Sequence, residues 1–297
     1  MSALDFPAWR SLLYVPANVE RFVARAHAAG ADAVILDLED AVAPDQKAAA
    51  RRSVGPAAAQ LVRYGIDVMV RINRPLTLAV DDLAGVVGPD VGCLVLPKVM
   101  GPDHLRLLSE VVTECEVRHG VRAGTTRFVV IIETAEAVLR VREIAHADPR
   151  IVALTLGTED LATELHVDPA ADVLAAHHAA LIAAAVDAAV LPLGLVGSIA
   201  EFRDLAAFGA IARRSGEYGY RGSACIHPAQ IPILNAAFTP ALEEVERARK
   251  IVAAYDAAQA NGQGAIALDG RMIDVPVAQR AHALLKTYEA ISSRHDL

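Results

Sequence analysis

Charged side chains stand at the ends of several short apolar runs in this sequence, where they could act together on a substrate. The clearest run is Ile151–Leu156, which is followed by Gly157 and then by the adjacent carboxylates Glu159 and Asp160. An apolar run of this length next to glycine is typical of a buried strand, so both acids are expected at a carboxyl end. Four other apolar runs deliver polar groups at the same end: Asp37, Glu39, Asp40, Arg71, Lys98 and Glu133.

Carboxylates that converge from three strands repel one another unless a cation neutralises them. A small number of oxygen ligands suits Mg²⁺, which keeps several of its waters and leaves room for a substrate. No histidine accompanies these acids at ligand spacing, which disfavours zinc and iron. Arg71 at the same rim would supply a bidentate clamp for a carboxylate or an enolate oxygen. Mg²⁺ and arginine beside a carbonyl group indicate a site that stabilises an enolate or a developing alkoxide.

Each of these residues also has a structural interpretation. A single acid at a strand end can cap the following helix, and Asp160 fits that role. Lys98 can be a solvated charge at the rim. His227, which precedes Pro228 after the last predicted strand, is interpreted equally well as a catalytic or as a structural histidine. Asp274 stands in a turn, where an acid ordinarily stabilises the turn itself.

The apolar runs alternate with helical patterns along the chain. Asn18 is predicted to cap the first helix, which Gly30 closes. Eight strand–helix alternations favour a (β/α)₈ TIM barrel, in which the site lies at the carboxyl ends of the strands. An open doubly wound sheet stays an alternative because the seventh run is the weakest, although no glycine-rich nucleotide fingerprint follows the first. The predicted strands are Arg10–Val15, Ala33–Leu38, Val68–Ile72, Cys93–Leu96, Phe128–Ile132, Ile151–Leu156, Leu191–Val196 and Ser223–Ile226.

The character of the sequence changes at Thr239. Residues 1–238 form the predicted catalytic barrel, and residues 239–297 form a C-terminal extension that is too short for an independent domain. Pro240–Gln259 and Pro276–Ser293 have helical patterns, with a turn signal at Asp269-Gly270 between them. We expect this extension to be a helical lid that packs on the barrel mouth or on a neighbouring subunit.

The composition indicates a globular, acidic protein. Hydrophobic residues make up 54% of the 297 residues, and the net charge is −8. A nucleic-acid partner would call for a basic face, so none is expected. No apolar run approaches the roughly 20 residues that cross a bilayer, and the N-terminus lacks the pattern of a signal peptide. The three cysteines have no CxxC spacing, which argues against a zinc site or a disulfide framework. We therefore expect a cytoplasmic protein without a membrane partner.

Taken together, segments spread over almost the whole chain resemble the citrate lyase β-subunit-like proteins of the HpcH/HpaI aldolase/citrate lyase family. The segments occur in the same order as in that family. They are RSLLYVPAN (Arg10–Asn18), ADAVILDLEDAVAPDQKAAAR (Ala31–Arg51), VRIN (Val70–Asn73), VLPKV (Val95–Val99), IIET (Ile131–Thr134), LGTEDLATEL (Leu156–Leu165), GYRGSACIHPAQI (Gly219–Ile231), AAFTP (Ala236–Pro240) and DGRMIDVPVAQRA (Asp269–Ala281).

The resemblance implies a (β/α)₈ barrel with a C-terminal lid that assembles as a homotrimer or hexamer. It also implies Mg²⁺-dependent carbon–carbon lyase chemistry on thioesters of coenzyme A or of an acyl carrier. Glu133 and Asp160 resemble the direct metal ligands of the family, with Glu133 also near the substrate. Glu39 and Asp40 resemble acids that hold metal-bound water. Arg71 resembles the clamp on the carboxylate and carbonyl oxygens of the substrate.

Two further groups of residues take their roles from the resemblance. Asp274 matches an acid that related acyl-CoA lyases supply from the adjacent subunit, where it exchanges a proton with the thioester α-carbon. Tyr14, Asn18 and Arg21 match the region that approaches coenzyme A in the family.

Three positions depart from the family pattern. Ala17 replaces a common glycine, and Ser223 replaces the usual lysine before the IHP motif. The segment Pro192–Leu205 lacks the aspartate-containing pattern that is common there, so the identity of the substrate stays open.

The resulting hypothesis is a lyase that cleaves citryl-CoA, malyl-CoA or citramalyl-CoA into acyl-CoA and a 2-oxo acid, or forms such a thioester from them. Synthase or thioesterase activity at the same site is included in this hypothesis. One alternative is an aldolase of the same family that acts on free 2-oxo acids without coenzyme A. That alternative expects a histidine in the loop after the second strand, and this loop has none. The other alternative, a non-catalytic subunit of a lyase complex, predicts a degraded metal set, whereas Glu133 and Asp160 are both present.

Overall fold

The apolar runs of the sequence form eight parallel strands, which pair in the order β7-β6-β5-β4-β3-β2-β1-β8. β1 pairs with both β2 and β8, so the first strand of the chain is not an edge. The computed structural model describes residues 8–200 and 202–295. The strands are β1 (Ser11–Pro16), β2 (Ala33–Asp37), β3 (Asp67–Arg71), β4 (Cys93–Leu96), β5 (Arg127–Ile132), β6 (Ile151–Leu156), β7 (Leu191–Leu193) and β8 (Ser223–Cys225).

Backbone hydrogen bonds next to the assigned strands close the ring between β7 and β8. The amide of Arg221 donates to the carbonyl of Pro192 at 3.0 Å, and the amide of Gly194 donates to that of Gly222 at 2.8 Å. The expected (β/α)₈ barrel is therefore confirmed, and the open sheet is excluded. The seventh strand, which has the weakest pattern in the sequence, has only 3 residues in the structure.

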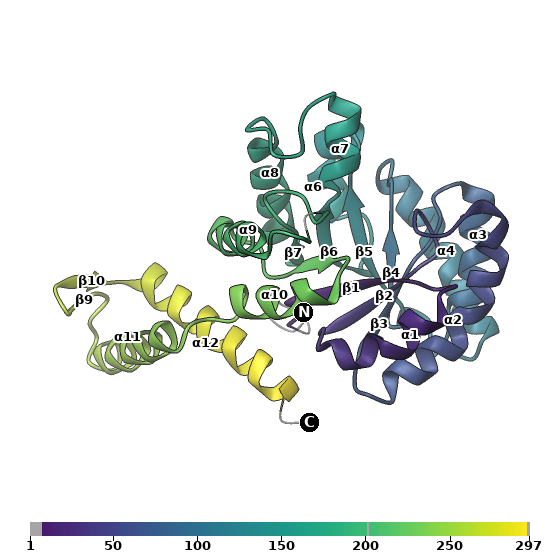
Figure 1. Ribbon diagram of the computed structural model, residues 1–297. Coiled ribbons are helices and arrows are strands. Elements are labelled where there is room, and N and C mark those ends of the chain that lie inside the picture. Colours follow the sequence, from purple (N-terminus) through teal and green to yellow (C-terminus); the bar gives the residue numbers. More distant parts are fainter. Residues whose placement is uncertain (1–7, 201, 296–297) are drawn as a thin grey trace. The chain divides into compact units, whose positions relative to one another are not determined.

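Helices connect successive strands and surround the barrel (Figure 1). Short 3₁₀ turns precede or follow several of them, at His27–Ala29, Pro44–Gln46 and Pro228–Gln230. The helices of the barrel unit are α1 (Glu20–Ala26), α2 (Lys47–Val62), α3 (Leu76–Val86), α4 (Pro102–Arg118), α5 (Ala135–Leu139), α6 (Val141–Ala145), α7 (Thr158–Leu165), α8 (Leu174–Asp187), α9 (Leu205–Tyr218) and α10 (Ile231–Ala237).

The start of the first helix differs from the prediction. The amide of Val19 donates to the carbonyl of Pro16 at 3.1 Å, which forms a turn that leaves Asn18 outside the helix. Val19 then occupies the N-cap position without a side-chain cap, so the predicted cap by Asn18 is wrong. Gly30 adopts the left-handed conformation after the 3₁₀ turn that follows α1, as predicted for the residue that closes this segment.

The barrel strands are buried on both faces because helices cover the outside and side chains fill the inside. Every residue of β2 and β4 is buried, which explains their continuous aliphatic sequence. At the opposite end from the charged residues, a Cβ on Gly222 would lie 1.7 Å from the carbonyl oxygen of Trp9. Only glycine allows the chain to enter β8 along this path.

A second compact unit comprises the chain from Thr239 onward. It consists of α11 (Leu242–Ala260), the antiparallel pair β9 (Ile266–Leu268) and β10 (Arg271–Ile273), and α12 (Val275–His295). A small apolar core of Tyr255, Ile273 and Ala278 joins these elements. The function of this unit as a lid stays a prediction. Within the described residues, none of the helices has the length and apolar character needed to cross a membrane.

Candidate active site and metal centre

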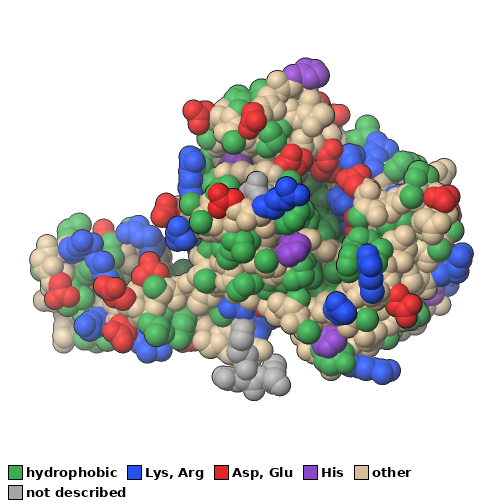
Figure 2. All heavy atoms as spheres, viewed as in Figure 1, with side chains coloured by type: hydrophobic (Ala, Val, Ile, Leu, Met, Phe, Trp, Pro, Cys, Tyr) green, Lys and Arg blue, Asp and Glu red, His purple; other side chains and the backbone are tan. Residues whose placement is uncertain are grey.

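The structure gathers most of the predicted site residues around one cavity of about 210 Å³ at the carboxyl ends of the strands. Its lining includes Tyr14 from β1, Arg71 from β3, Glu133 after β5, and Asp160 in the first turn of α7. Asp40, from the loop after β2, completes this group. In Figure 2, acidic side chains gather beside a hollow between α7 and the helices α3 and α4. Side chains from five separate segments, which are strands, loops and the start of a helix, therefore share one site.

Arg71 is held in place by Asp37, the last residue of the neighbouring strand. Asp37 and Arg71 are register partners in β2 and β3. The guanidinium donates from Nε and Nη2 to the two oxygens of Asp37, each at 2.7 Å. Burial alone would lower the pKa of Arg71, but the hydrogen bonds to Asp37 and the charges of nearby carboxylates raise it. The bidentate face predicted for the substrate is therefore used by Asp37.

Asp37 also orders the loop that carries the acidic pair. Its Oδ1 accepts from the amide of Glu39 at 2.9 Å, and its Oδ2 accepts from the amide of Ala41 at 3.2 Å. Lys47 fixes the same loop by donating to the carbonyl of Leu38 at 2.7 Å. Asp37 is recognisable in the sequence as an acid at a strand end, but its partnership with Arg71 follows only from the strand register.

Glu133 is buried at the centre of the site with 4% of its surface exposed. Its Oε1 accepts from the amide of Lys98 at 2.6 Å. Burial, followed by repulsion from Asp160, raises the pKa of Glu133 to about 8. A Cβ on Gly157 would lie 2.4 Å from Glu133 Oε2. The glycine at the start of α7 is therefore required for this carboxylate to lie beside Asp160.

Lys98 lies among the acids and is more than a solvated rim charge. Its Nζ is 3.0 Å from Glu39 Oε1, 3.8 Å from Asp160 Oδ2 and 4.0 Å from Asp40 Oδ1. The residue has a φ of 48°, in the left-handed region that a lysine rarely adopts. Burial lowers the pKa of Lys98, but the hydrogen bond to Glu39 and the charges of the nearby carboxylates together raise it. The backbone at Lys98 thus presents an amide to Glu133 while its side chain reaches the other acids.

Glu39 and Asp40 bind cationic side chains in this structure. Glu39 is buried, and its Oε2 lies 2.9 Å from Arg71 Nη1, although the angles are not those of a hydrogen bond. Burial raises the pKa of Glu39, opposed by the charge of Arg71. Asp40 is exposed and lies 3.4 Å from the same Arg71 nitrogen. Their predicted role in holding metal-bound water stays a prediction.

The donor set of Glu133 and Asp160 fits a magnesium ion. Mg²⁺ is commonly bound through one or two carboxylates and keeps several waters. Burial and the charge of Asp160 raise the pKa of Glu133, and a divalent cation between the two carboxylates would favour the charged form of both. Within residues 8–200 and 202–295, no three His, Cys, Asp or Glu side chains converge with metal-ligand geometry. The two-carboxylate set therefore needs oxygen atoms from water or substrate.

The residues predicted to approach coenzyme A lie in two different places. Tyr14 is part of the cavity wall, with the Arg71 guanidinium 4.8 Å from its ring centroid. Burial raises the pKa of its hydroxyl. Asn18 and Arg21 are exposed and do not line the cavity. Tyr14 is therefore placed to support Arg71, and the coenzyme A contacts of all three residues stay predictions.

His227 has a structural role in the described geometry. Its Nδ1 accepts from the amide of Ala229 at 3.1 Å, and its own amide donates to Gln230 Oε1 at 3.1 Å. These two bonds form a capping box at the turn after β8. The imidazole also stacks on Phe202, with ring centroids 5.3 Å apart. The histidine therefore joins two loops, which favours its structural interpretation.

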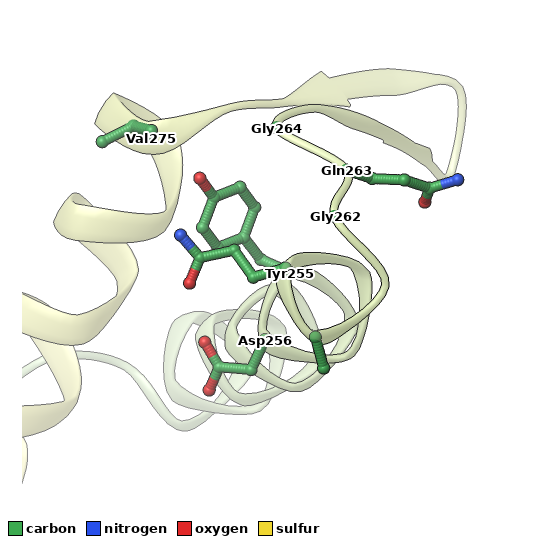
Figure 3. Close-up of a pocket in the computed structure, with 8 residues that line it drawn as sticks. Tyr255, Asp256, Gly262, Gln263, Gly264 and Val275 are labelled. Atoms are coloured by element: carbon green, nitrogen blue, oxygen red, sulfur yellow. The ribbon is translucent and has the colours of Figure 1, made fainter.

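Asp274 belongs to the C-terminal unit and stands immediately before α12. Its Oδ1 accepts from the amide of Val277 at 3.3 Å, and the side chain is half-buried. The same unit contains an open cavity beside Tyr255, whose buried hydroxyl has no hydrogen-bond partner among the described residues. Figure 3 shows the tyrosine ring extending from α11 toward the start of α12. The predicted reach of Asp274 into the site of an adjacent subunit stays a prediction.

Comparison with known proteins gives consistent relatives over nearly the full chain. The family model for HpcH/HpaI aldolase/citrate lyase matches residues 10–228. L-malyl-CoA/β-methylmalyl-CoA lyase of Cereibacter sphaeroides is 33% identical over 96% of both chains. Citrate lyase subunit beta of Leuconostoc mesenteroides subsp. cremoris is 31% identical over 95% of this chain and 93% of that protein. The crystal structure of protein CitE from Mycobacterium tuberculosis with magnesium, acetoacetate and coenzyme A has a TM-score of 0.75, at 28% identity over 95% of this chain and 98% of that one.

Proposed function

Because the chain belongs to the HpcH/HpaI aldolase/citrate lyase family, we propose that it is a Mg²⁺-dependent carbon–carbon lyase acting on a 3-hydroxyacyl thioester of coenzyme A. The observation that carries this proposal is the pairing of Glu133 with Asp160 beside Arg71 in one cavity. The names of the relatives support it, since one is a malyl-CoA lyase and another a citrate lyase subunit. The related crystal structure, which contains magnesium and coenzyme A, supports the choice of metal and of thioester.

The reaction divides a 3-hydroxyacyl thioester into acyl-CoA and a 2-oxo acid. The hydroxyl proton passes to solvent water, the bond between C2 and C3 breaks, and its electron pair moves into the thioester as an enolate. A proton added to C2 then gives acyl-CoA; the forward and reverse directions use the same groups. When bound, Mg²⁺ supplies positive charge at the oxygen that changes between alkoxide and carbonyl.

Arg71 places a second positive charge at that oxygen. Asp37 occupies Nε and one side of Nη2, so the N–H groups that remain for the substrate are on the terminal nitrogens. Tyr14 packs beneath the guanidinium, and Glu39 lies beside Nη1. These contacts fix the orientation of Arg71 before a substrate arrives, which is the arrangement expected of a preorganised electrostatic site.

The first turn of α7 is suited to the carboxylate of the 2-oxo acid. Gly157 is the N-cap residue and offers no side-chain cap to the helix. Within the helix, Leu161 donates its amide to the carbonyl of Gly157 at 3.0 Å, so the three preceding amides point toward the N-terminal end. Thr158, Glu159 and Asp160 all line the cavity. A carboxylate at this position receives backbone hydrogen bonds and the favourable end of the helix dipole.

Asp274 of an adjacent subunit exchanges the proton at C2 of the acyl thioester in this proposal. Asp274 precedes α12 in the C-terminal unit, which is compact in its own right and separate from the barrel unit, and this supports a role in a site other than that of its own barrel. A site completed in this way requires an oligomer, and we propose a homotrimer or hexamer. We further propose a cytoplasmic enzyme, in keeping with three buried cysteines that remain free thiols.

The test is a product analysis with the purified full-length chain. Malyl-CoA, citramalyl-CoA and citryl-CoA are each incubated with Mg²⁺, and the acyl-CoA, the free CoA and the 2-oxo acid are quantified. The proposal expects acyl-CoA and 2-oxo acid in equal amounts from at least one substrate, and none after chelation of Mg²⁺. Free CoA without a 2-oxo acid would indicate a thioesterase instead. Cleavage of free 2-oxo-3-deoxy acids alone would support the aldolase without coenzyme A.

A further inference from the structure

The charged groups of the cavity are unevenly distributed. Among the described residues that line it, Arg71 carries the only cationic side chain. Four carboxylates line the same cavity: Asp40, Glu133, Glu159 and Asp160. A divalent metal ion together with Arg71 still leaves more negative than positive charge around the bound substrate. The site can therefore accommodate one substrate carboxylate more easily than two.

The two cationic side chains nearest the carboxylates of the cavity, Arg71 and Lys98, are already paired with protein carboxylates. Arg71 uses Nε and Nη2 for Asp37, and its Nη1 lies 2.9 Å from Glu39. Lys98 donates to Glu39 at 3.0 Å and lies 3.8 Å from Asp160. In the proposed function the remaining N–H groups of Arg71 serve the reacting oxygen. A second substrate carboxylate would therefore have to displace one of these contacts and leave a partly buried acid without its partner, which is costly.

The remaining wall of the cavity is mostly apolar and carries no charge. Its apolar side chains are Ile131, Leu156, Leu195, Ile199 and Ala224, with Gly194 and Gly197 beside them, and Thr155 adds a neutral hydroxyl. Ser223 also lines it, but its hydroxyl donates to the carbonyl of Ala224 at 3.0 Å. A hydrogen atom or an alkyl group on the substrate loses little hydration free energy when it contacts this wall. A charged carboxymethyl group would lose hydration without gaining a cationic partner.

We infer that the site selects 3-hydroxyacyl thioesters whose cleavage releases a 2-oxo acid with a single carboxylate, such as glyoxylate or pyruvate, over those that release a dicarboxylate. This inference rests on the proposed function and specifies its substrate class. The carboxylate next to the oxo group lies at the first turn of α7, and the substituent on the other side of the oxo carbon faces the apolar wall. The excess of carboxylates in the cavity repels a second negative charge on that substituent.

A matched set of four thioesters separates charge from size. Malyl-CoA carries hydrogen, citramalyl-CoA carries methyl, and citryl-CoA carries carboxymethyl at C3. The fourth substrate is the homologue of citramalyl-CoA with isobutyl in place of methyl, which releases 4-methyl-2-oxopentanoate and matches the branched shape of the carboxymethyl group without its charge. With Mg²⁺ and the full-length chain, we expect kcat/KM for citryl-CoA to be at least about tenfold below that for the isobutyl substrate.

Two variants test the electrostatic origin of the preference. Glu159→Gln removes one negative charge from the lining, and its amide oxygen can still accept from Ser198, which donates to Glu159 in the structure. We expect this variant to raise the ratio of kcat/KM for citryl-CoA to kcat/KM for the isobutyl substrate roughly threefold. Glu217→Gln makes the same change of charge on an exposed residue at the C-terminal end of α9, and it should leave the ratio unchanged.

The outcomes separate this inference from the proposed function. Equal or better kcat/KM for citryl-CoA would overturn the inference and leave the lyase proposal intact. Equally poor cleavage of citryl-CoA and the isobutyl substrate would show that size decides the preference, which also overturns the inference. An absence of cleavage with all four substrates would overturn both. If Glu159→Gln does not fold, the same ratio of kcat/KM values is measured for the wild type at about 0.02 and at about 0.2 M salt. Higher salt should raise the ratio because it screens the repulsion of the extra carboxylate. A ratio that does not change with salt would contradict the inference.

Discussion

Asp37→Asn tests whether the buried pair with Arg71 holds the active site together. The Asp37 side chain is 1% exposed and that of Arg71 is 14% exposed. Removing one partner of a buried ion pair costs about 3–5 kcal/mol. Arg71 retains Glu39 at 2.9 Å, and asparagine retains one acceptor oxygen. We therefore expect the free energy of unfolding to fall by about 2–3 kcal/mol.

A matched control removes a carboxylate from an exposed pair. Asp81 lies 3.7 Å from Arg51, and its side chain is 64% exposed. Asp81→Asn should lower the free energy of unfolding by less than about 0.5 kcal/mol. The comparison keeps the chemistry of the substitution constant and changes only burial and geometry.

Urea unfolding followed by tryptophan fluorescence measures both variants. Trp9 is the single tryptophan of the chain, it is buried in the barrel unit, and its Nε1 donates to Asp67 at 2.6 Å. Its fluorescence therefore reports the unfolding of the barrel. A loss for Asp37→Asn that is no greater than that for Asp81→Asn would refute the reasoning. In the same preparation, a raised KM for the thioester is expected because Arg71 loses its orientation.

Three further predictions concern other parts of the barrel. Lys98→Asn introduces a residue that tolerates the left-handed conformation at this position. It should tighten Mg²⁺ binding several-fold in calorimetric titration, because the cation that competes for Glu39 is removed. Weaker Mg²⁺ binding would contradict this expectation. Gly157→Ala should abolish the rise in Tm caused by Mg²⁺, because the new Cβ would lie 2.4 Å from Glu133 Oε2. In the control Gly55→Ala, the new Cβ meets no atom within 4 Å, so this variant should retain the rise in Tm. Burial lowers the pKa of His178 to about 4; the unfolded state therefore binds more protons below pH 6.5, and stability is lost as the pH falls toward 4. Between pH 7 and 5 the wild type should lose about 2 kcal/mol more than His178→Gln, and parallel pH profiles would exclude this histidine as the cause.

The sequence predicts the arrangement of the site well where position along a strand decides it. Glu133 and Asp160 follow adjacent strands, so a parallel barrel necessarily brings them to the same end. Asp37 and Arg71 also end adjacent strands, yet their pairing depends on a register that periodicity does not reveal. The end of the barrel at which each charged side chain lies was therefore predictable, but the partner with which it pairs was not.

Local backbone geometry explains most of what the sequence pattern missed. The left-handed φ of Lys98 turns its amide toward Glu133, and no propensity indicates such a conformation for lysine. The turn after Pro16 moves the helix start past Asn18. The capping role of His227 depends on Gln230, three residues later, whose side chain accepts the His227 amide. Asp274 differs in kind, because its predicted role depends on a second copy of the chain.

The most direct test of the account compares thioester cleavage by the wild type and by Glu133→Gln at increasing Mg²⁺ concentration. Glu136→Gln, on an exposed residue three positions later, is the matched control. The account predicts Mg²⁺-dependent formation of acyl-CoA and 2-oxo acid by the wild type and by the control. It predicts a loss of at least about 10²-fold for Glu133→Gln, as expected when an electrostatic stabiliser of the transition state is removed. Cleavage by Glu133→Gln at the wild-type rate, with the same dependence on Mg²⁺, would contradict the assignment of Glu133 to the metal site.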